Sequence, residues 1–208
     1  EKRAALLRVM VSCTGGRNAG ISHPPQSAAL FAPVHARRSH SGARPAPAGA
    51  LATITYDGPV TFHMNGEDIQ LIRVRNAHTD GDTFVQFVKA NVIMTGDFFR
   101  SIQYPNIDRT NGGSLPGLIA ALDAVIKAAG PATKIVPGHG PVVDVSAVKA
   151  HRDIVVALRD KVDKLVKEGK TQEQVIAAKP TAEFDAKVQQ PGTTADRFVG
   201  QLFAELKK

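Results

Sequence analysis

The sequence predicts an α/β fold, a β-sheet covered by helices, over residues 50–208 of the 208-residue chain. Two observations lead to this prediction. Short apolar runs flank the turn signals Asn65-Gly66 and Lys89-Ala90-Asn91, as in antiparallel hairpins. Patterns with helical periodicity then follow, separated by one short apolar run. With 43% hydrophobic and 22% charged residues, the chain has the composition of an ordinary globular protein.

The expected strands are runs of about three to six residues that end at turn-forming residues. The strongest turn signal is Asn65-Gly66, because both residues readily adopt the positive φ that a two-residue hairpin loop needs. In chain order we expect strands at Leu51–Tyr56, Val60–Met64, Ile69–Val74, Thr83–Val88, Val92–Thr95 and Lys134–Val136.

The expected helices each begin at a residue that can cap the first turn. Ser114 would cap a helix that continues to about Ala129. Ser146 would cap a longer one that runs to Glu168 and is closed by Gly169. Thr171 to Gln174 fits a capping box for a short helix, and a last helix covers about Ala195–Leu206.

Residues 1–49 differ in composition from the rest of the chain. The stretch 14–50 is rich in Gly, Ala, Pro, Ser and Arg and has no sustained periodicity, so we expect a disordered or loop-like segment there. Its composition is also what a GC-rich gene gives when read out of frame. One hypothesis is therefore a shifted reading frame that is restored around Ala43–Pro47. The alternative is an authentic, divergent linker.

The positive charge of the chain, +7 in total, is concentrated in the same segment. Residues 1–56 contain seven basic residues and one acidic residue, while the remainder holds 19 basic and 18 acidic residues. We therefore expect no nucleic-acid partner for the folded part, although residues 2–56 leave a nucleic-acid binder as the last-ranked alternative. We expect no membrane partner and, without a signal peptide, a cytoplasmic location.

Three short motifs place a His or an Asp beside glycine just past an expected strand. Glycine lets the backbone approach closely, and such loops can direct side chains into one shared cleft. Imidazole and carboxylate together suit zinc or a similar divalent metal. Cys13 is the only cysteine, which excludes a Cys-rich zinc site. The three motifs are Ala77-His78-Thr79-Asp80-Gly81-Asp82, Thr95-Gly96-Asp97-Phe98-Phe99 and Pro137-Gly138-His139-Gly140-Pro141.

In order and spacing, these motifs resemble those of the metallo-β-lactamase superfamily. The tail, with Ala178-Lys179-Pro180-Thr181 and Phe184-Asp185, is similar to one branch of zinc hydrolases with that fold. The resemblance implies an αββα sandwich with one or two zinc ions at one edge. It also implies that His78 binds the first metal, Asp97 bridges or binds the second, and His139 binds the second.

The sequence departs from the family in its N-terminal half, which is lacking or altered. The family's His-x-His-x-Asp-His loop is missing, and Val11-Ser12-Cys13 stand where its histidines belong. Because two ligands rarely hold zinc tightly, we expect weak or absent zinc binding, and hydrolysis far below that of intact relatives, unless another histidine replaces the lost ligands. The candidates for that replacement are His23, His35 and His40.

Other candidate residues carry alternatives that the sequence leaves open. Asp80 and Asp82 would either orient His78 or form the turn around Gly81, and no catalytic base is assigned. We expect His63 to pair across strands, and His151, on the apolar stripe of a helix, to be a hydrogen-bonded core residue. Three aromatic residues would either wall a substrate cleft or pack in the core, namely Phe98, Phe99 and Tyr104.

The function implied by the resemblance is hydrolysis by zinc-activated water of a small-molecule substrate: a lactam, a lactone, an ester or a thioester. The alternative is a non-catalytic fragment or interaction module that keeps part of the fold. The sequence does not choose a substrate or an oligomeric state.

Overall fold

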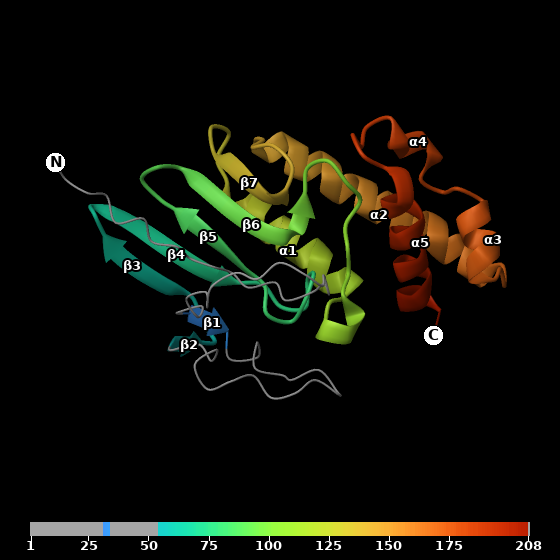
Figure 1. Cartoon of the computed structure of the whole chain (residues 1–208), viewed down its shortest axis with the longest axis horizontal. Helices are drawn as coiled ribbons and strands as arrows, with labels where there is room; N and C mark the ends of the chain where they lie inside the picture. Colours follow the sequence, from blue (N-terminus) through green and yellow to red (C-terminus); the bar gives the residue numbers. More distant parts are fainter. Residues whose placement is uncertain (1–30, 34–53, 208) are drawn as a thin grey trace, which may run out of the picture.

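A computed structural model describes residues 31–33 and 54–207 of the chain (Figure 1). Its main feature is a five-stranded sheet in the order β3-β4-β5-β6-β7. Neighbouring strands are antiparallel from β3 to β6, and β7 is parallel to β6. The strands are β3 (Val60–Met64), β4 (Glu67–Arg73), β5 (Thr83–Phe87), β6 (Val92–Arg100) and β7 (Lys134–His139).

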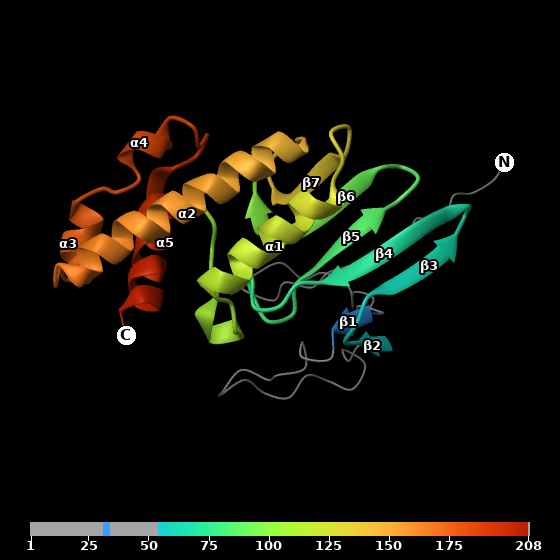
Figure 2. The ribbon, with the colours of Figure 1, turned by 180° about the vertical axis from the view of Figure 1, so that it is seen from behind.

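Helices cover one face of this sheet and extend beyond its end (Figure 2). The helices that pack together over the face are α1 and α2, and the three remaining α-helices lie beyond the sheet beside the far end of α2. The helices are α1 (Leu115–Ala128), α2 (Val145–Lys167), α3 (Gln172–Ala177), α4 (Ala182–Asp185) and α5 (Gly192–Leu206). The predicted α/β fold of sheet and covering helices is thereby confirmed.

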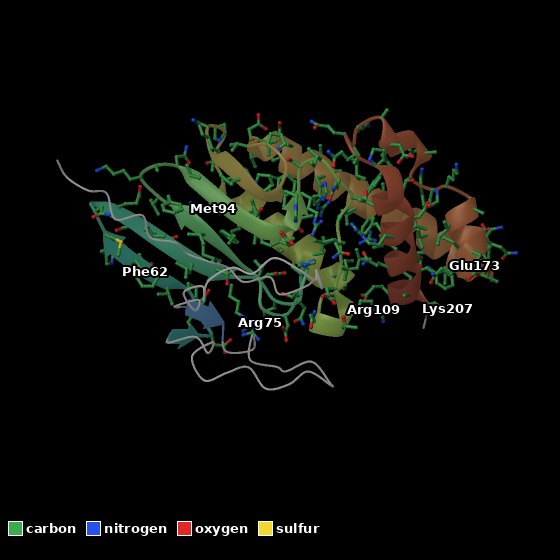
Figure 3. All side chains as sticks on the ribbon, in the orientation of Figure 1. Phe62, Arg75, Met94, Arg109, Glu173 and Lys207 are labelled. Atoms are coloured by element: carbon green, nitrogen blue, oxygen red, sulfur yellow. The ribbon has the colours of Figure 1, made fainter. Side chains whose placement is uncertain are left out.

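The period-two alternation of β6 shows how the sheet is covered. Ile93 is completely buried in the cluster that includes the apolar stripes of α1 and α2. Its neighbour Met94, labelled in Figure 3, points to the opposite face and is 42% exposed. On that opposite face lies a smaller buried cluster of Ile69 and Leu71 from β4, Val85 from β5, and Tyr56, which precedes β3.

The predicted turn at Asn65-Gly66 is present, with φ angles of 56° and 73°. The turn aligns His63 with Asp68 across the strands, and His63 Nδ1 lies 2.6 Å from Asp68 Oδ1. The expected cross-strand pairing of His63 is therefore confirmed. The capping box of α3 is also confirmed, because Thr171 and Gln174 exchange side-chain to backbone hydrogen bonds.

Several element boundaries differ from the prediction. Strand β6 continues past Thr95 to Arg100, and β7 continues to His139, because pairing between the two strands carries on through register shifts. The N-cap of α2 is Asp144, and Ser146 is already helical, because the Asp144 carboxylate accepts hydrogen bonds from two backbone N–H groups of the first turn. Helix α5 begins at Gly192, and the single-turn helix α4 was not predicted.

The segment 1–49 lies almost entirely outside the described residues. Within it, Phe31–Pro33 form strand β1, which pairs in parallel with β2 (Ile54–Tyr56). These three residues are a correction to the expectation of a loop, since strand pairing does not need an apolar periodicity. The disorder and reading-frame hypotheses for the rest of 1–49 remain predictions. No helix in the described part of the chain is both long and apolar enough to cross a membrane.

Candidate functional site

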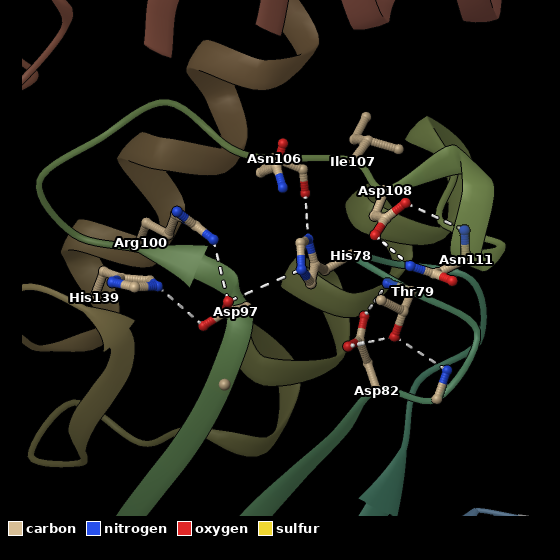
Figure 4. Close-up of polar contacts among 12 residues, drawn as sticks. His78, Thr79, Asp82, Asp97, Arg100, Asn106, Ile107, Asp108, Asn111 and His139 are labelled. Carbon is tan, nitrogen blue, oxygen red and sulfur yellow. Dashed lines mark hydrogen bonds and ion pairs between the residues drawn. The ribbon is translucent and has the colours of Figure 1, made fainter. Parts of the chain in front are cut away.

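The three residues singled out by the motifs meet around the carboxylate of Asp97 (Figure 4). His139 Nε2 lies 3.3 Å from Asp97 Oδ1, and His78 Nε2 lies 3.9 Å from Asp97 Oδ2. The fold brings them together from separate elements: His78 follows β4, Asp97 is in β6, and His139 ends β7. Because β6 and β7 are parallel neighbours, Asp97 and His139 lie at the same edge of the sheet.

Glycines permit the close approach of β6 and β7 at this edge. Gly96 has a φ of +67°, and the register between the two strands shifts on either side of it. A Cβ atom added at Gly138 would overlap both Asp97 Oδ1 and the backbone of Gly96. Glycine at 138 is therefore required for the Asp97 carboxylate to lie beside the end of β7.

His78 is held in one ring orientation. Its side chain is almost fully buried, and Nδ1 lies 2.7 Å from the carbonyl oxygen of Asn106. A carbonyl oxygen can only accept a hydrogen bond, so Nδ1 carries the hydrogen. In the neutral ring Nε2 is then left with a free lone pair that faces Asp97. This is the arrangement by which metal-binding histidines are commonly oriented.

Asp82 acts on the loop of His78 and not on its ring. The backbone N–H and the hydroxyl of Thr79 donate to the Asp82 carboxylate, at 2.9 and 3.1 Å. Burial raises the pKa of Asp82, and these hydrogen bonds together with the nearby His78 oppose that rise. Among the described residues, neither Asp80 nor Asp82 has a hydrogen bond to the imidazole of His78, and the Asp82 carboxylate instead holds Thr79 in the turn.

The structure adds one residue to the site that the sequence did not indicate. Arg100 lies in β6 three residues after Asp97, and its Nη2 is 3.1 Å from Asp97 Oδ2. Its side chain is only 11% exposed, and its Nε is buried without a hydrogen-bond partner in the described part of the chain. A cation therefore already neutralises the carboxylate on which both histidines converge.

The chemistry of the donor set matches zinc. Two imidazole nitrogens and one carboxylate are ligands that zinc prefers, and His78 presents its Nε2 already oriented. Within residues 31–33 and 54–207, however, no group of three or more His, Cys, Asp or Glu side chains is assembled as a metal cage. His23, His35 and His40 lie outside the described residues. The residues present thus fit a zinc site with an incomplete ligand set.

The aromatic candidates Phe98, Phe99 and Tyr104 are each about 1% exposed and belong to the core, and Phe99 also lines a cavity. His151 is only partly as predicted. It lies on α2 and packs edge-on against Phe99, with ring centroids 5.2 Å apart, but its buried Nε2 has no hydrogen-bond partner among the described residues. The ring borders a cavity of about 590 Å³ between β6, α2 and α4, and no described protein group supplies a hydrogen bond to Nε2 there.

Comparison with solved structures identifies the fold. No family model and no curated protein sequence matches the chain. The chain is similar to the stereoselective inverting sec-alkylsulfatase Pisa1 from Pseudomonas sp., with a TM-score of 0.61 and 14% identity over 74% of this chain and 26% of that one. It is also similar to a metallo-beta-lactamase from Pontibacter korlensis, with a TM-score of 0.43 and 20% identity over 49% of this chain and 47% of that one. The DIM-1 metallo-beta-lactamase has a TM-score of 0.43 and 19% identity, over 52% of this chain and 49% of that one.

The solved proteins are longer than the part of each that this chain matches. The chain spans about a quarter of the length of the alkylsulfatase and about half of each lactamase. At identities below a quarter, the likeness establishes the fold alone. The likeness to the alkylsulfatase, at a TM-score of 0.61, bears out the fold that the motifs predicted over part of its extent.

Proposed function

We propose that this chain contributes to a metal-dependent hydrolase of the metallo-β-lactamase superfamily. The observation that carries the proposal is the convergence of His78, Asp97 and His139 at one sheet edge, with His78 Nε2 already turned toward the Asp97 carboxylate. The fold shared with a solved alkylsulfatase supports it. The substrate class we propose is a small molecule with a lactam, lactone, ester or thioester carbonyl.

His78, Asp97 and His139 would each bind a metal through a particular atom. His78 would bind through Nε2, because Nδ1 is engaged by the Asn106 carbonyl oxygen. Asp97 would bind through either oxygen, and His139 would bind through the Nε2 that faces Asp97 Oδ1. One or two zinc ions held here would supply a water of lowered pKa as the source of hydroxide and polarise the carbonyl under attack.

The chain's own side chains set the charge and the water access at this edge. Arg100 balances the Asp97 carboxylate when no metal is bound. His78 is nearly enclosed, whereas the His139 side chain is 49% exposed, so a substrate would approach from the side of His139. A general base is not among the residues we assign.

A second candidate function is a non-catalytic fragment or interaction module that keeps part of the fold. One observation favours it: the Arg100 guanidinium lies 3.1 Å from Asp97 Oδ2, the oxygen that a metal bound beside His78 would need. In that case the Asp97–Arg100 pair would be a permanent structural ion pair and zinc would not bind.

Metal analysis of the purified full chain, with and without added zinc, separates the two functions. The hydrolase predicts zinc that is weakly held but measurable, and lower zinc content in His139→Ala than in His151→Ala, since His139 faces Asp97 while His151 lies on α2. A panel of β-lactam, lactone, ester and thioester substrates, assayed with zinc added, then tests the reaction. We expect hydrolysis well below that of enzymes with a complete ligand set.

Two results would decide against the proposal. Equal zinc content in both variants would remove His139 from the site. No zinc uptake by the parent chain at any tested concentration would favour the non-catalytic module. Tight, stoichiometric zinc with rapid hydrolysis would instead show that another histidine completes the site, and His23, His35 and His40 would be substituted next.

A further inference from the structure

A side chain from the last helix forms hydrogen bonds with loop 106–108, which contains the carbonyl group that orients His78. The amide nitrogen of Gln201, on α5, donates to Asn106 Oδ1 at 2.9 Å. The amide oxygen of the same side chain accepts from the backbone N–H of Ile107 at 3.0 Å. Gln201 is separated from this loop by more than 90 residues of sequence, and both hydrogen bonds are partly buried.

One peptide group links Gln201 to the imidazole of His78. The carbonyl of Asn106 and the N–H of Ile107 belong to the same planar peptide unit. Its oxygen accepts from His78 Nδ1 at 2.7 Å, and its N–H donates to Gln201 Oε1. Rotation of this peptide would break both hydrogen bonds at once. Donation from the N–H also polarises the carbonyl, which strengthens it as an acceptor.

A backbone hydrogen bond also joins this loop to His78. The N–H of Asp108 donates to the carbonyl oxygen of His78 at 2.9 Å, so loop 106–108 holds both the main chain and the ring of His78. Ile107, between them, is 2% exposed and anchors the loop in the core. Gln201 joins this loop directly to α5, and the ion pair of Arg109 with Glu205 joins the next residues of the chain to the same helix.

We propose that Gln201 is a positioning residue for His78. It holds the Asn106–Ile107 peptide so that the imidazole keeps its hydrogen on Nδ1 and presents the lone pair of Nε2 toward Asp97. The consequence for zinc rests on the proposed function, whereas the consequence for the tautomer does not. Groups that orient a metal-binding histidine in this way typically contribute about 10- to 100-fold to metal affinity.

Gln201 and Asn106 line a groove together with residues of α3 and α5. The test compares two substitutions at Gln201 with a control substitution at another residue of this groove. Gln201→Met keeps the length of the side chain and removes both hydrogen bonds. Gln201→Glu keeps an oxygen that can accept from Ile107 N–H, so it should rescue the orientation. Gln172→Leu is the control, because Gln172 lines the same groove as Gln201 and Asn106 but has no hydrogen bond to the loop in the described part of the chain.

The first measurement is the tautomer of His78 in the metal-free full chain, read from the nitrogen shifts of labelled histidine in its neutral form. The His78 signal is assigned by its loss in His78→Gln. We expect the Nδ1–H tautomer in the parent, in Gln201→Glu and in Gln172→Leu, and a mixture with the Nε2–H tautomer in Gln201→Met. The second measurement is zinc affinity by competition, which we expect to fall about tenfold in Gln201→Met alone.

An unchanged His78 tautomer in a folded Gln201→Met variant would overturn the proposal, as would an equal change in Gln172→Leu. If Gln201→Met does not fold, judged by circular dichroism, Gln201→Ala takes its place in the same comparison. If the parent binds no zinc, the proposed function fails, but a shifted tautomer in Gln201→Met would still establish the positioning role. The two failures are thus distinguishable.

Discussion

Replacing His151 should make the stability of the protein less sensitive to acid. The His151 ring packs against Phe99 on the sheet side of α2, and its buried Nε2 has no hydrogen-bond partner among the described residues. Burial disfavours the charged imidazolium and lowers the pKa of His151 from 6.5 to about 4. The unfolded chain has no such burial, so its His151 keeps the ordinary pKa.

The sign of the effect follows from which state binds the proton first. As the pH falls below 6.5, His151 is protonated in the unfolded state, whereas in the folded state it stays neutral until about pH 4. The free energy of unfolding therefore decreases between these two pH values. Between pH 7 and pH 4.5, a shift of this size costs the folded state about 2 kcal/mol. Below the folded pKa no further loss arises from this residue.

The assay is urea unfolding at several pH values between 7 and 4.5, for the parent, His151→Leu and the control Ile154→Leu, which changes a neighbouring residue of the same cavity wall. The carboxylates titrate in all three proteins, so the difference between the curves isolates the histidine. We expect His151→Leu to lose about 2 kcal/mol less stability than the parent over this range. Ile154 carries no titratable group, so Ile154→Leu should leave the slope unchanged. Parallel curves for the parent and His151→Leu would refute the reasoning.

Two further predictions concern stability. Gly117→Ala should destabilise the protein by about 2 kcal/mol in urea unfolding, although alanine favours helices, because its Cβ would overlap the carbonyl oxygen of Asn76. Gly130→Ala, whose Cβ meets no atom closer than 3.7 Å, should change stability by less than about 0.5 kcal/mol, and equal effects at the two glycines would contradict the overlap. Thr171→Ala should cost about 1 kcal/mol through loss of the capping box of α3, whereas Thr171→Ser should cost little.

Local signals in the sequence predicted local structure well. The Asn65-Gly66 turn and the capping box at Thr171 depend on residues adjacent in sequence, and both are present. The N-cap of α2 was misassigned to Ser146, because the helix already begins at Val145, where the Asp144 carboxylate accepts from the N–H groups of Ser146 and Ala147. The convergence of His78, Asp97 and His139 at one sheet edge is observed, while their role as metal ligands remains a prediction.

The residues that the sequence could not indicate act through long-range contacts. The role of Gln201 appears only when α5 packs against loop 106–108, because neither residue type nor spacing signals a bond across more than 90 residues. Asn106 contributes its backbone carbonyl, which every residue has, so no side-chain pattern could reveal it. Arg100 follows Asp97 by three residues, but only the register shifts of β6 bring its guanidinium back to that carboxylate.

The competition for Asp97 explains why the ligand set and the charge of this site must be considered together. Asp97 Oδ1 faces His139, and Oδ2 lies between His78 and Arg100. A zinc ion seated between His78 and Asp97 must share Oδ2 with the guanidinium or displace it, and either course costs free energy because the Arg100 side chain is largely buried. Zinc binding by only two protein ligands does not release enough free energy to offset this cost. Additional histidine ligands would strengthen binding enough to do so. Occupancy of this edge by metal therefore depends as much on displacing Arg100 as on completing the ligands.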